Sequence, residues 1–265
     1  MSQYSEKTLE TVKGLRLIDD TLFRLVAARK EACQEILRTL LDDPDLIVIQ
    51  ATPQETVTSI HREIILDVLC QTKDGKFINV EVQKGANNDD VRRCRFHLSS
   101  ITANKTPKGT SFKDVPDVSI VYITEYDALG NNQSFTCSEM CQKVGDSYVP
   151  VSDGAKVYYV NTVIKDNTDK SELMDLFLVS DVFDSKKFPE LSKAMKYFKK
   201  EEGVSTVCTL VENYAKEYAE EYAKEYAKDQ MVNAAKLLIK KDLSDEEIST
   251  ITQLSIEEIK ALRNS

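Results

Sequence analysis

The stretch from His61 to Lys84 constrains the fold most, because it predicts two strands joined by a tight turn. The first strand is an almost unbroken apolar run that contains one charge, Asp67. The second strand alternates apolar and polar residues, as half-buried strands do, and its polar face carries Glu81. An Asp-Gly pair ending in Gly75 is typical of a hairpin turn. We therefore expect a sheet built around this hairpin.

The length of the turn decides where the two charged side chains lie. A three-residue loop pairs Thr72 with Lys76, and it places Asp67 directly opposite Glu81, with Cβ atoms about 5 Å apart on one face. A two-residue turn would pair Asp67 with Val82 and put the carboxylates on opposite faces. We predict the first register. Such a pair repels itself unless a divalent cation binds between the carboxylates; the alternative is an edge hairpin whose acidic residues face solvent.

The spacing of these residues resembles a known nuclease core. Asp67, followed by Glu81-Val82-Gln83 on the next strand, is similar to the PD-(D/E)XK pattern, with Leu66 in place of the proline and Gln83 in place of the lysine. The E-x-Q form resembles the branch called PD-(D/E)XK nuclease family transposase, or recombination-promoting nuclease. Three further stretches are similar to motifs of this branch. Residues 20–23 resemble its D-x-x-F helix, residues 92–101 its R-x-R-Y helix, and residues 122–130 its later strand and turn.

The resemblance covers about residues 12–203 and implies the fold class. We expect an α/β, restriction-endonuclease-like core, with a mixed central sheet flanked by helices, over residues 1–203. An α-helical C-terminal extension would occupy residues 204–265.

The resemblance also implies a metal-dependent DNA endonuclease, a hydrolase of phosphodiester bonds that serves recombination of mobile elements. Asp67 and Glu81 would be catalytic and would bind Mg²⁺, or Mn²⁺ or Ca²⁺, while Gln83 would position water or phosphate. Arg93 and Arg95 match the family's arginine pair and would contact DNA.

Two alternatives stay open at this point. Asp20 is a further candidate for the metal centre, because an acidic residue on the first helix approaches the metal in some related folds; capping that helix is its other role. Gln83 cannot supply the charge of a lysine. The competing hypothesis is therefore a weak or inactive nuclease fold that binds DNA or protein through its helical tail.

Composition limits the partners and the setting. The 265 residues include 35 basic and 44 acidic side chains, a net charge of −9, which argues against a protein that coats nucleic acid indiscriminately. A local run of basic residues between Lys84 and Lys113 predicts either a phosphate path or a solvated helix face. Six scattered cysteines form no C-x-x-C pair, and no apolar run approaches the ~18 residues of a membrane helix. We expect a cytoplasmic protein with no membrane partner.

The remaining periodicities predict elements whose bounds can be compared with the structure. Helices are expected at residues 17–41, 89–104, 173–178 and 193–198, and strands at 46–51, 56–60, 118–124, 133–140 and 156–160. Residues 1–14 predict no ordered element. In the helix after the hairpin, the residues expected to face the sheet are Val91, Phe96, Leu98 and Ile101.

The tail has a different character. Residues 214–229 repeat a four-residue unit that starts with tyrosine, which predicts a long helix. The helix could be a solvated linker or could form a seam between two copies of the chain. Both roles stay open, although the strict heptad of a coiled coil is missing. Capping boxes at Ser244 and Ser255 predict two short helices. Their expected small core consists of Ile248, Ile251, Leu254, Ile256, Ile259 and Leu262.

Overall fold

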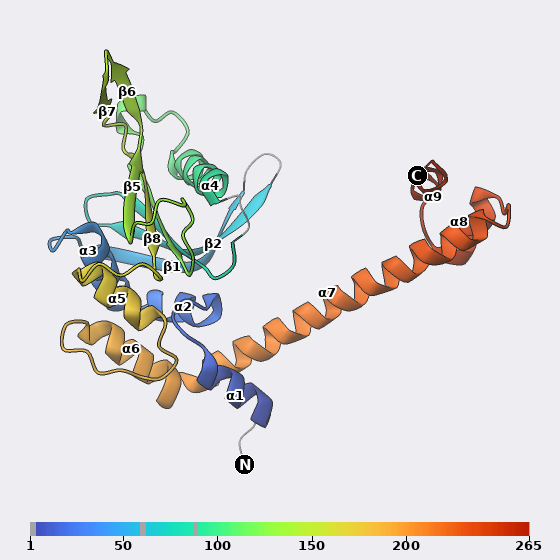
Figure 1. The fold of residues 1–265 in the computed structure, drawn as a ribbon, viewed down its shortest axis with the longest axis horizontal. Helices are drawn as coiled ribbons and strands as arrows, with labels where there is room; N and C mark the ends of the chain where they lie inside the picture. Colours follow the sequence, from blue (N-terminus) through green and yellow to red (C-terminus); the bar gives the residue numbers. More distant parts are fainter. Residues whose placement is uncertain (1–3, 59–61, 87–89, 265) are drawn as a thin grey trace. The chain divides into compact units, whose positions relative to one another are not determined.

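In the computed structural model the hairpin lies within a six-stranded mixed sheet of order β1–β2–β3–β4–β8–β5 (Figure 1). The structure describes residues 4–58, 62–86 and 90–264. Strands β3, β4 and β8 are parallel, and the other neighbouring pairs in this sheet are antiparallel. The strands are Val48–Thr58 (β1), Glu63–Thr72 (β2), Phe77–Gln83 (β3), Val118–Thr124 (β4), Phe135–Glu139 (β5), Cys141–Val144 (β6), Ser147–Pro150 (β7) and Ala155–Asn161 (β8). The expected mixed α/β core is confirmed.

Helices flank the sheet on both faces (Figure 1). One face is covered by α4, whose Cys94 and Ile101 share a core with Leu69 and Ile120. On the other face α3 brings the Cys33 sulfur to 2.9 Å from that of Cys70 on β2. The helices are Glu6–Gly14 (α1), Asp20–Ala27 (α2), Lys30–Leu41 (α3), Asp90–Lys105 (α4), Asp169–Phe177 (α5), Pro189–Lys200 (α6), Val204–Ile239 (α7), Asp245–Thr252 (α8) and Ile256–Arg263 (α9).

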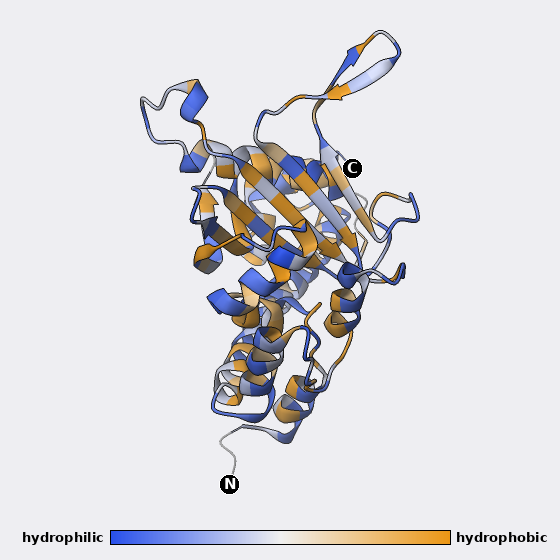
Figure 2. Ribbon diagram, turned by 90° about the vertical axis from the view of Figure 1, so that its left-hand side faces the viewer, coloured by the Kyte–Doolittle hydropathy of each residue, from blue (hydrophilic) through white to orange (hydrophobic). Residues whose placement is uncertain are grey.

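The central strands match the hydropathy pattern that predicted them. Val68, Val80 and Val121 pair across β2, β3 and β4 and are all buried, while polar residues recur between the apolar ones (Figure 2). Strand β4 has the predicted bounds, residues 118–124. The predicted strands at 46–51 and 56–60 are instead one strand, β1, whose pairing with β2 continues from Val48 to Thr58. Ile60, His61 and Asp89, which the sequence placed at element ends, lie outside the described residues.

Two predictions about the N-terminal region were wrong. The helix expected at 17–41 is two helices, because Arg29 between them has extended backbone angles at the N-cap of α3. Residues 1–14, expected to be unordered, contain α1. Its last turn is held from a distance: the Lys199 ammonium on α6 donates to the carbonyl oxygens of Val12, Lys13 and Leu15 at 2.7–2.8 Å. Such a tertiary cap leaves no local signal.

Helix α4 is rotated relative to the prediction. Val91 and Phe96, expected to face the sheet, are 54% and 39% exposed. Ile101 is buried and Leu98 packs partly against the core, as predicted, but the other buried positions on this side are Cys94 and His97. The rotation places polar side chains of α4 against the sheet and leaves arginines and Phe96 on its outer side.

The chain divides into two compact units, residues 1–209 and 210–265. In the second unit both predicted capping boxes, at Ser244 and Ser255, are present. The small core there contains Ala235, Ile248, Leu254 and Ile259, whereas Ile251 and Ile256 are exposed, contrary to prediction. The four repeat tyrosines of α7 are exposed, and the linker and seam roles both stay predictions. No helix among the described residues is long and apolar enough to cross a bilayer.

We expect residues 1–209 to fold without the tail, and residues 1–203 to fold less stably. Val207 and Cys208 are fully buried in the first unit, so ending the chain at 203 removes two core side chains. Thermal melts of both fragments and of the full chain measure this. A non-cooperative melt of 1–209, or equal melting temperatures for the two fragments, would contradict the expectation.

Candidate active site

The predicted register of the hairpin is confirmed. Strands β2 and β3 pair from Gln71–Phe77 to Val68–Val80, and the Thr72 amide donates to the Lys76 carbonyl at 3.0 Å. Gly75 has a φ of +87°, which glycine adopts without steric cost. Continued by one step, this register puts Asp67 opposite Glu81.

At Asp67 the pairing of β2 with β3 ends, and its pairing with β1 is interrupted for one position. The ladder to β3 ends at Val68–Val80, and the ladder to β1 skips the position where Gln54 faces Asp67. Gln54 has a φ of +54°, a left-handed conformation that costs free energy in a non-glycine residue and is found most often at functional sites. The carboxylates therefore lie at a local break in the sheet.

The two carboxylates replace the missing ladder bonds. The amide of Val82 donates to Oδ2 of Asp67 at 2.9 Å, and the amide of Asp67 lies 3.4 Å from Oε1 of Glu81. Each side chain thus reaches across to the backbone of the other strand. This reciprocal contact fixes both carboxylates beside the carboxyl ends of the parallel strands β3 and β4.

Asp20 joins the pair from the first turn of α2. Its carboxyl lies close enough to those of Asp67 and Glu81 for their negative charges to repel, and a guanidinium nitrogen of Arg24, on the next helical turn, lies 3.8 Å from Oδ2 of Asp20. Its Oδ1 atom is buried and has no hydrogen-bond partner among the described residues. The adjacent Asp19, at the N-cap, makes no side-chain capping bond. The structure thus places Asp20 with the other carboxylates.

Burial and repulsion favour the protonated carboxyls. Desolvation, then the charges of Glu81 and Asp20, raise the pKa of Asp67 to about 9. Desolvation also raises the pKa of Asp20, against the lowering effect of Arg24. When no cation compensates the negative charge, the cluster therefore has its lowest free energy with a proton bound between its carboxylates.

Two residues that the sequence did not indicate hold Glu81 in place. Asn79, on the same face of β3, donates to Oε1 of Glu81 at 2.7 Å, and Nδ1 of His97 on α4 lies 3.4 Å from the same oxygen. All three side chains are buried. The spacing of Asn79 two residues before Glu81 was a usable signal; the approach of His97 depends on the rotation of α4.

Gln83 lies at the end of β3, where its amide donates to the carbonyl of Gly85 at 2.9 Å. The neighbouring Lys84 is not part of the carboxylate cluster, because its ammonium pairs with Asp19 at 2.6 Å. A bidentate pair between Arg16 and Glu125, with contacts of 2.6 and 2.8 Å, closes the same edge. At the position where the resemblance implies a lysine, the structure has the amide of Gln83, and the adjacent Lys84 is paired elsewhere.

The predicted arginine pair divides into two environments. Arg93 is half-buried and Arg95 is exposed. The helix that carries them is anchored at its start by Asp90, whose Oδ1 accepts hydrogen bonds from Tyr122 at 2.8 Å and Tyr126 at 2.5 Å. Because Tyr122 pairs with Glu81 in the sheet, this anchor sets the distance between α4 and the carboxylates.

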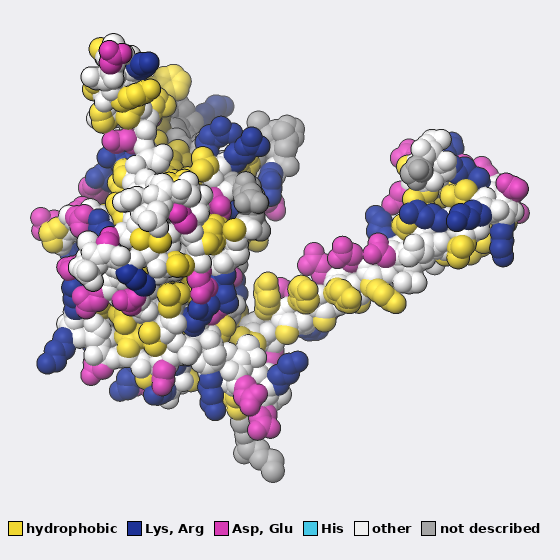
Figure 3. Space-filling model, in the orientation of Figure 1, with side chains coloured by type: hydrophobic (Ala, Val, Ile, Leu, Met, Phe, Trp, Pro, Cys, Tyr) yellow, Lys and Arg dark blue, Asp and Glu magenta, His cyan; other side chains and the backbone are white. Residues whose placement is uncertain are grey.

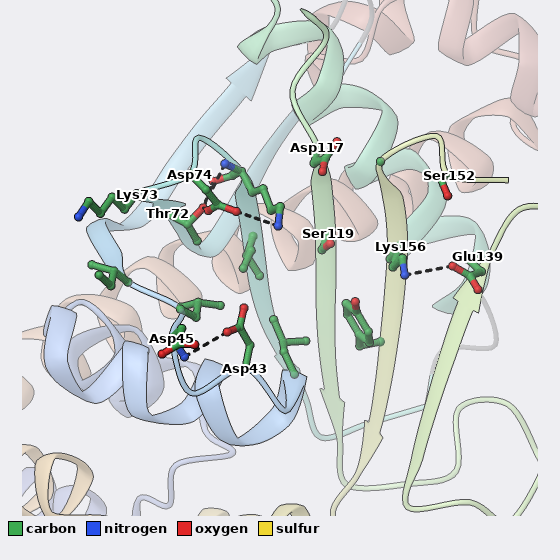
Figure 4. Close-up of a pocket in the computed structure, with 17 residues that line it drawn as sticks. Asp43, Asp45, Thr72, Lys73, Asp74, Asp117, Ser119, Glu139, Ser152 and Lys156 are labelled. Carbon is green, nitrogen blue, oxygen red and sulfur yellow. Dashed lines mark hydrogen bonds and ion pairs between the residues drawn. The ribbon is translucent and has the colours of Figure 1, made fainter. Parts of the chain in front are cut away.

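A cavity of about 850 Å³ lies at the opposite ends of the strands (Figure 4). It opens beside the hairpin turn and the starts of β4 and β8, at Asp117, Ser119 and Lys156. Its ionic groups neutralise one another in part, as with Lys156 and Glu139 at 3.1 Å. Ligands of open α/β sheets bind at the carboxyl ends of parallel strands, which favours the carboxylate cluster as the active site.

Comparison with known proteins agrees with this geometry. The model of the PD-(D/E)XK nuclease family transposases matches residues 19–238. The chain belongs to this family. The resemblance was expected over about residues 12–203; the match begins just before the motif at 20–23 and extends through most of α7, so it includes the repeat helix. Searches of curated proteins and of solved structures found no match.

Nucleases of the PD-(D/E)XK class generally use divalent metal ions, and the donor chemistry here fits one. Mg²⁺ is commonly held by one or two carboxylates together with water and phosphate oxygens. Asp67 and Glu81 supply such a pair, and the unpartnered Oδ1 of Asp20 is a further buried acceptor. Among residues 4–58, 62–86 and 90–264, no group of three or more potential ligands is already arranged around a metal position.

The raised pKa of Asp67 predicts how stability depends on pH. Between its ordinary value of 3.8 and about 9, the folded protein holds a proton that the unfolded chain has lost. In metal-free buffer the melting temperature should therefore fall as pH rises from about 5 to 9, and Asp67→Asn should flatten the slope. Asp146→Asn, in an exposed turn, is the control. If the melting temperature of Asp67→Asn fell with pH as steeply as that of the wild type, groups other than Asp67 would cause the pH dependence.

Proposed function

We propose that this protein is a divalent-metal-dependent DNA nuclease whose reaction centre is formed by Asp67 and Glu81. The observation that carries the proposal is the reciprocal contact of these carboxylates at the break between β2 and β3. Membership of a nuclease and transposase family supports a phosphodiester of DNA as the target. Cleavage that promotes recombination of mobile DNA is the role we propose for it.

In this proposal each residue has a defined task. Asp67 and Glu81 would hold Mg²⁺ or Mn²⁺, which when bound activates water and stabilises negative charge on phosphate. Asn79 and His97 both contact Oε1 of Glu81 and so would hold its carboxylate in place. Asp20 contributes negative charge that favours a cation over a proton at higher pH.

Gln83 would orient water or phosphate through its amide, and its bond to Gly85 fixes that amide near the end of β3. An amide carries no charge, so arginines on α4 must supply the positive charge that a lysine would give. This substitution also favours the competing function, an inactive nuclease fold that binds DNA. The two functions differ in cleavage but not in binding.

Plasmid DNA tests the nuclease directly. With Mg²⁺ or Mn²⁺ the wild type should nick the plasmid, EDTA should stop the reaction, and Asp67→Asn or Glu81→Gln should lower the rate at least about a hundredfold. Asp146→Asn should keep the wild-type rate.

The same metals should raise the melting temperature of the wild type by mass action, and Asp67→Asn should remove that gain. A metal-dependent gain without cleavage would support the inactive, metal-binding fold. Cleavage that survives both carboxylate substitutions would place the reaction centre elsewhere.

Exposure separates the expected effects of the two arginines. Arg95→Ala should weaken DNA binding and reduce its salt dependence at an unchanged melting temperature, because the side chain is exposed. Arg93→Ala should weaken DNA binding and also lower the melting temperature, since its side chain is half-buried. Fluorescence anisotropy at several salt concentrations, with parallel melts, measures both. Unchanged binding in Arg95→Ala would remove it from the DNA interface.

A further inference from the structure

A second concave site lies beside the carboxylate cluster, between the start of β2 and the outer side of α4. Its volume is about 390 Å³, on the scale of a site for one small ligand. Lys and Arg side chains gather where α4 lies in the space-filling view (Figure 3). The pocket is lined by Arg62, Ile64, Arg92, Arg93, Arg95, Phe96, His97 and Ser99.

The pocket concentrates positive charge in a chain that is acidic overall. Within the described parts of the chain, Arg62, Arg92 and Arg95 form no ion pair with a carboxylate, unlike Arg16, Arg24 and Arg263. Guanidinium groups without internal partners favour an anion, and their planar donors match phosphate oxygens. The charge therefore selects a phosphate-bearing ligand.

An aromatic side chain forms part of the same wall. Phe96 is 39% exposed and lies one helical turn after Arg92, so ring and guanidinium occupy one side of α4. Ile64 adds an apolar surface. An exposed ring next to cationic groups is the combination that binds single nucleic-acid strands, where bases stack on the ring and phosphates contact the cations.

The pocket is connected to the reaction centre through His97. This residue lines the pocket and also lies 3.4 Å from Glu81. A ligand in the pocket is therefore next to whatever phosphate the carboxylates hold. A base within a duplex is stacked on both faces and cannot reach Phe96, so a base bound here must be unpaired.

We infer that this pocket binds one unpaired nucleotide of the substrate strand, adjacent to the phosphate that is cleaved. The inference rests on the proposed nuclease function for its biological meaning. It gives the enzyme a preference for single-stranded, flapped or frayed DNA over blunt duplex. The recognised chemistry, a phosphate plus an unstacked base, is shared by DNA and RNA.

Binding by the full chain in EDTA tests the pocket without requiring cleavage. Fluorescent probes of equal length are a deoxythymidine strand, a uridine strand, a blunt duplex and a duplex with a short single-stranded flap. The wild type should bind the single strand and the flap at least about fivefold more tightly than the blunt duplex. Deoxythymidine and uridine strands compared directly show whether the sugar is distinguished.

Substitution of the ring gives the decisive comparison. Phe96→Ala should lose at least about fivefold in affinity for the single strand and the flap, while Phe96→Tyr should keep it. Phe112→Ala is the matched control, because Phe112 is 97% exposed and does not line the pocket. Arg62→Ala should weaken binding of the single strand and make that binding less dependent on salt concentration. Melting curves verify that each variant is folded.

The outcomes separate this inference from the nuclease proposal. If the wild type bound single strand and blunt duplex equally, or if Phe96→Ala bound as the wild type does, the inferred nucleotide binding by this pocket would be wrong even if plasmid is cleaved. Selective binding of unpaired strands that depends on Phe96 would support it even if no cleavage is found.

Discussion

The cost of placing three carboxylates where water is scarce is the constraint on which the rest of the structure depends. Two of them come from strands β2 and β3, just beyond the point where these strands stop pairing with each other, and the third comes from the start of α2. Their mutual repulsion is reduced by backbone amides, by Arg24 and by protons rather than by a full set of opposite charges. Such an arrangement lowers the free energy of unfolding, which is common at sites that bind a ligand.

The distribution of charge then follows from one helix. Helix α4 presents His97 to Glu81 on its inner side and arginines on its outer side, so acidic and basic groups are a few residues apart in sequence but face different spaces. Asp90 and its two tyrosines hold this helix at a fixed height over β4. An acidic protein can therefore attract phosphate locally without binding nucleic acid over its whole surface.

The sequence allowed the hairpin, its register and the buried strand β4 to be predicted, since each depends on local turn chemistry or on a continuous apolar run. It did not allow the orientation of α4 to be predicted. Val91 and Phe96 are apolar yet exposed, and His97 and Asp90 are polar yet buried, so amphipathic periodicity was right only for Ile101 and Leu98. The exposed β6–β7 hairpin and α1 were missed for a related reason: neither shows an apolar face, and α1 depends on Lys199 from a distant helix.

The break in the sheet has one more consequence. Amide protons in a regular ladder exchange with solvent slowly because neighbouring backbone carbonyls hold them, but the amides of Asp67 and Val82 are held by side-chain oxygens. Their rate of hydrogen exchange is therefore tied to the charge and ligation of the two carboxylates. The amides of Val68 and Val80, one step away in the intact ladder, are held by backbone alone. These four positions form a built-in reporter, in which two amides respond to events at the carboxylates and two serve as its reference.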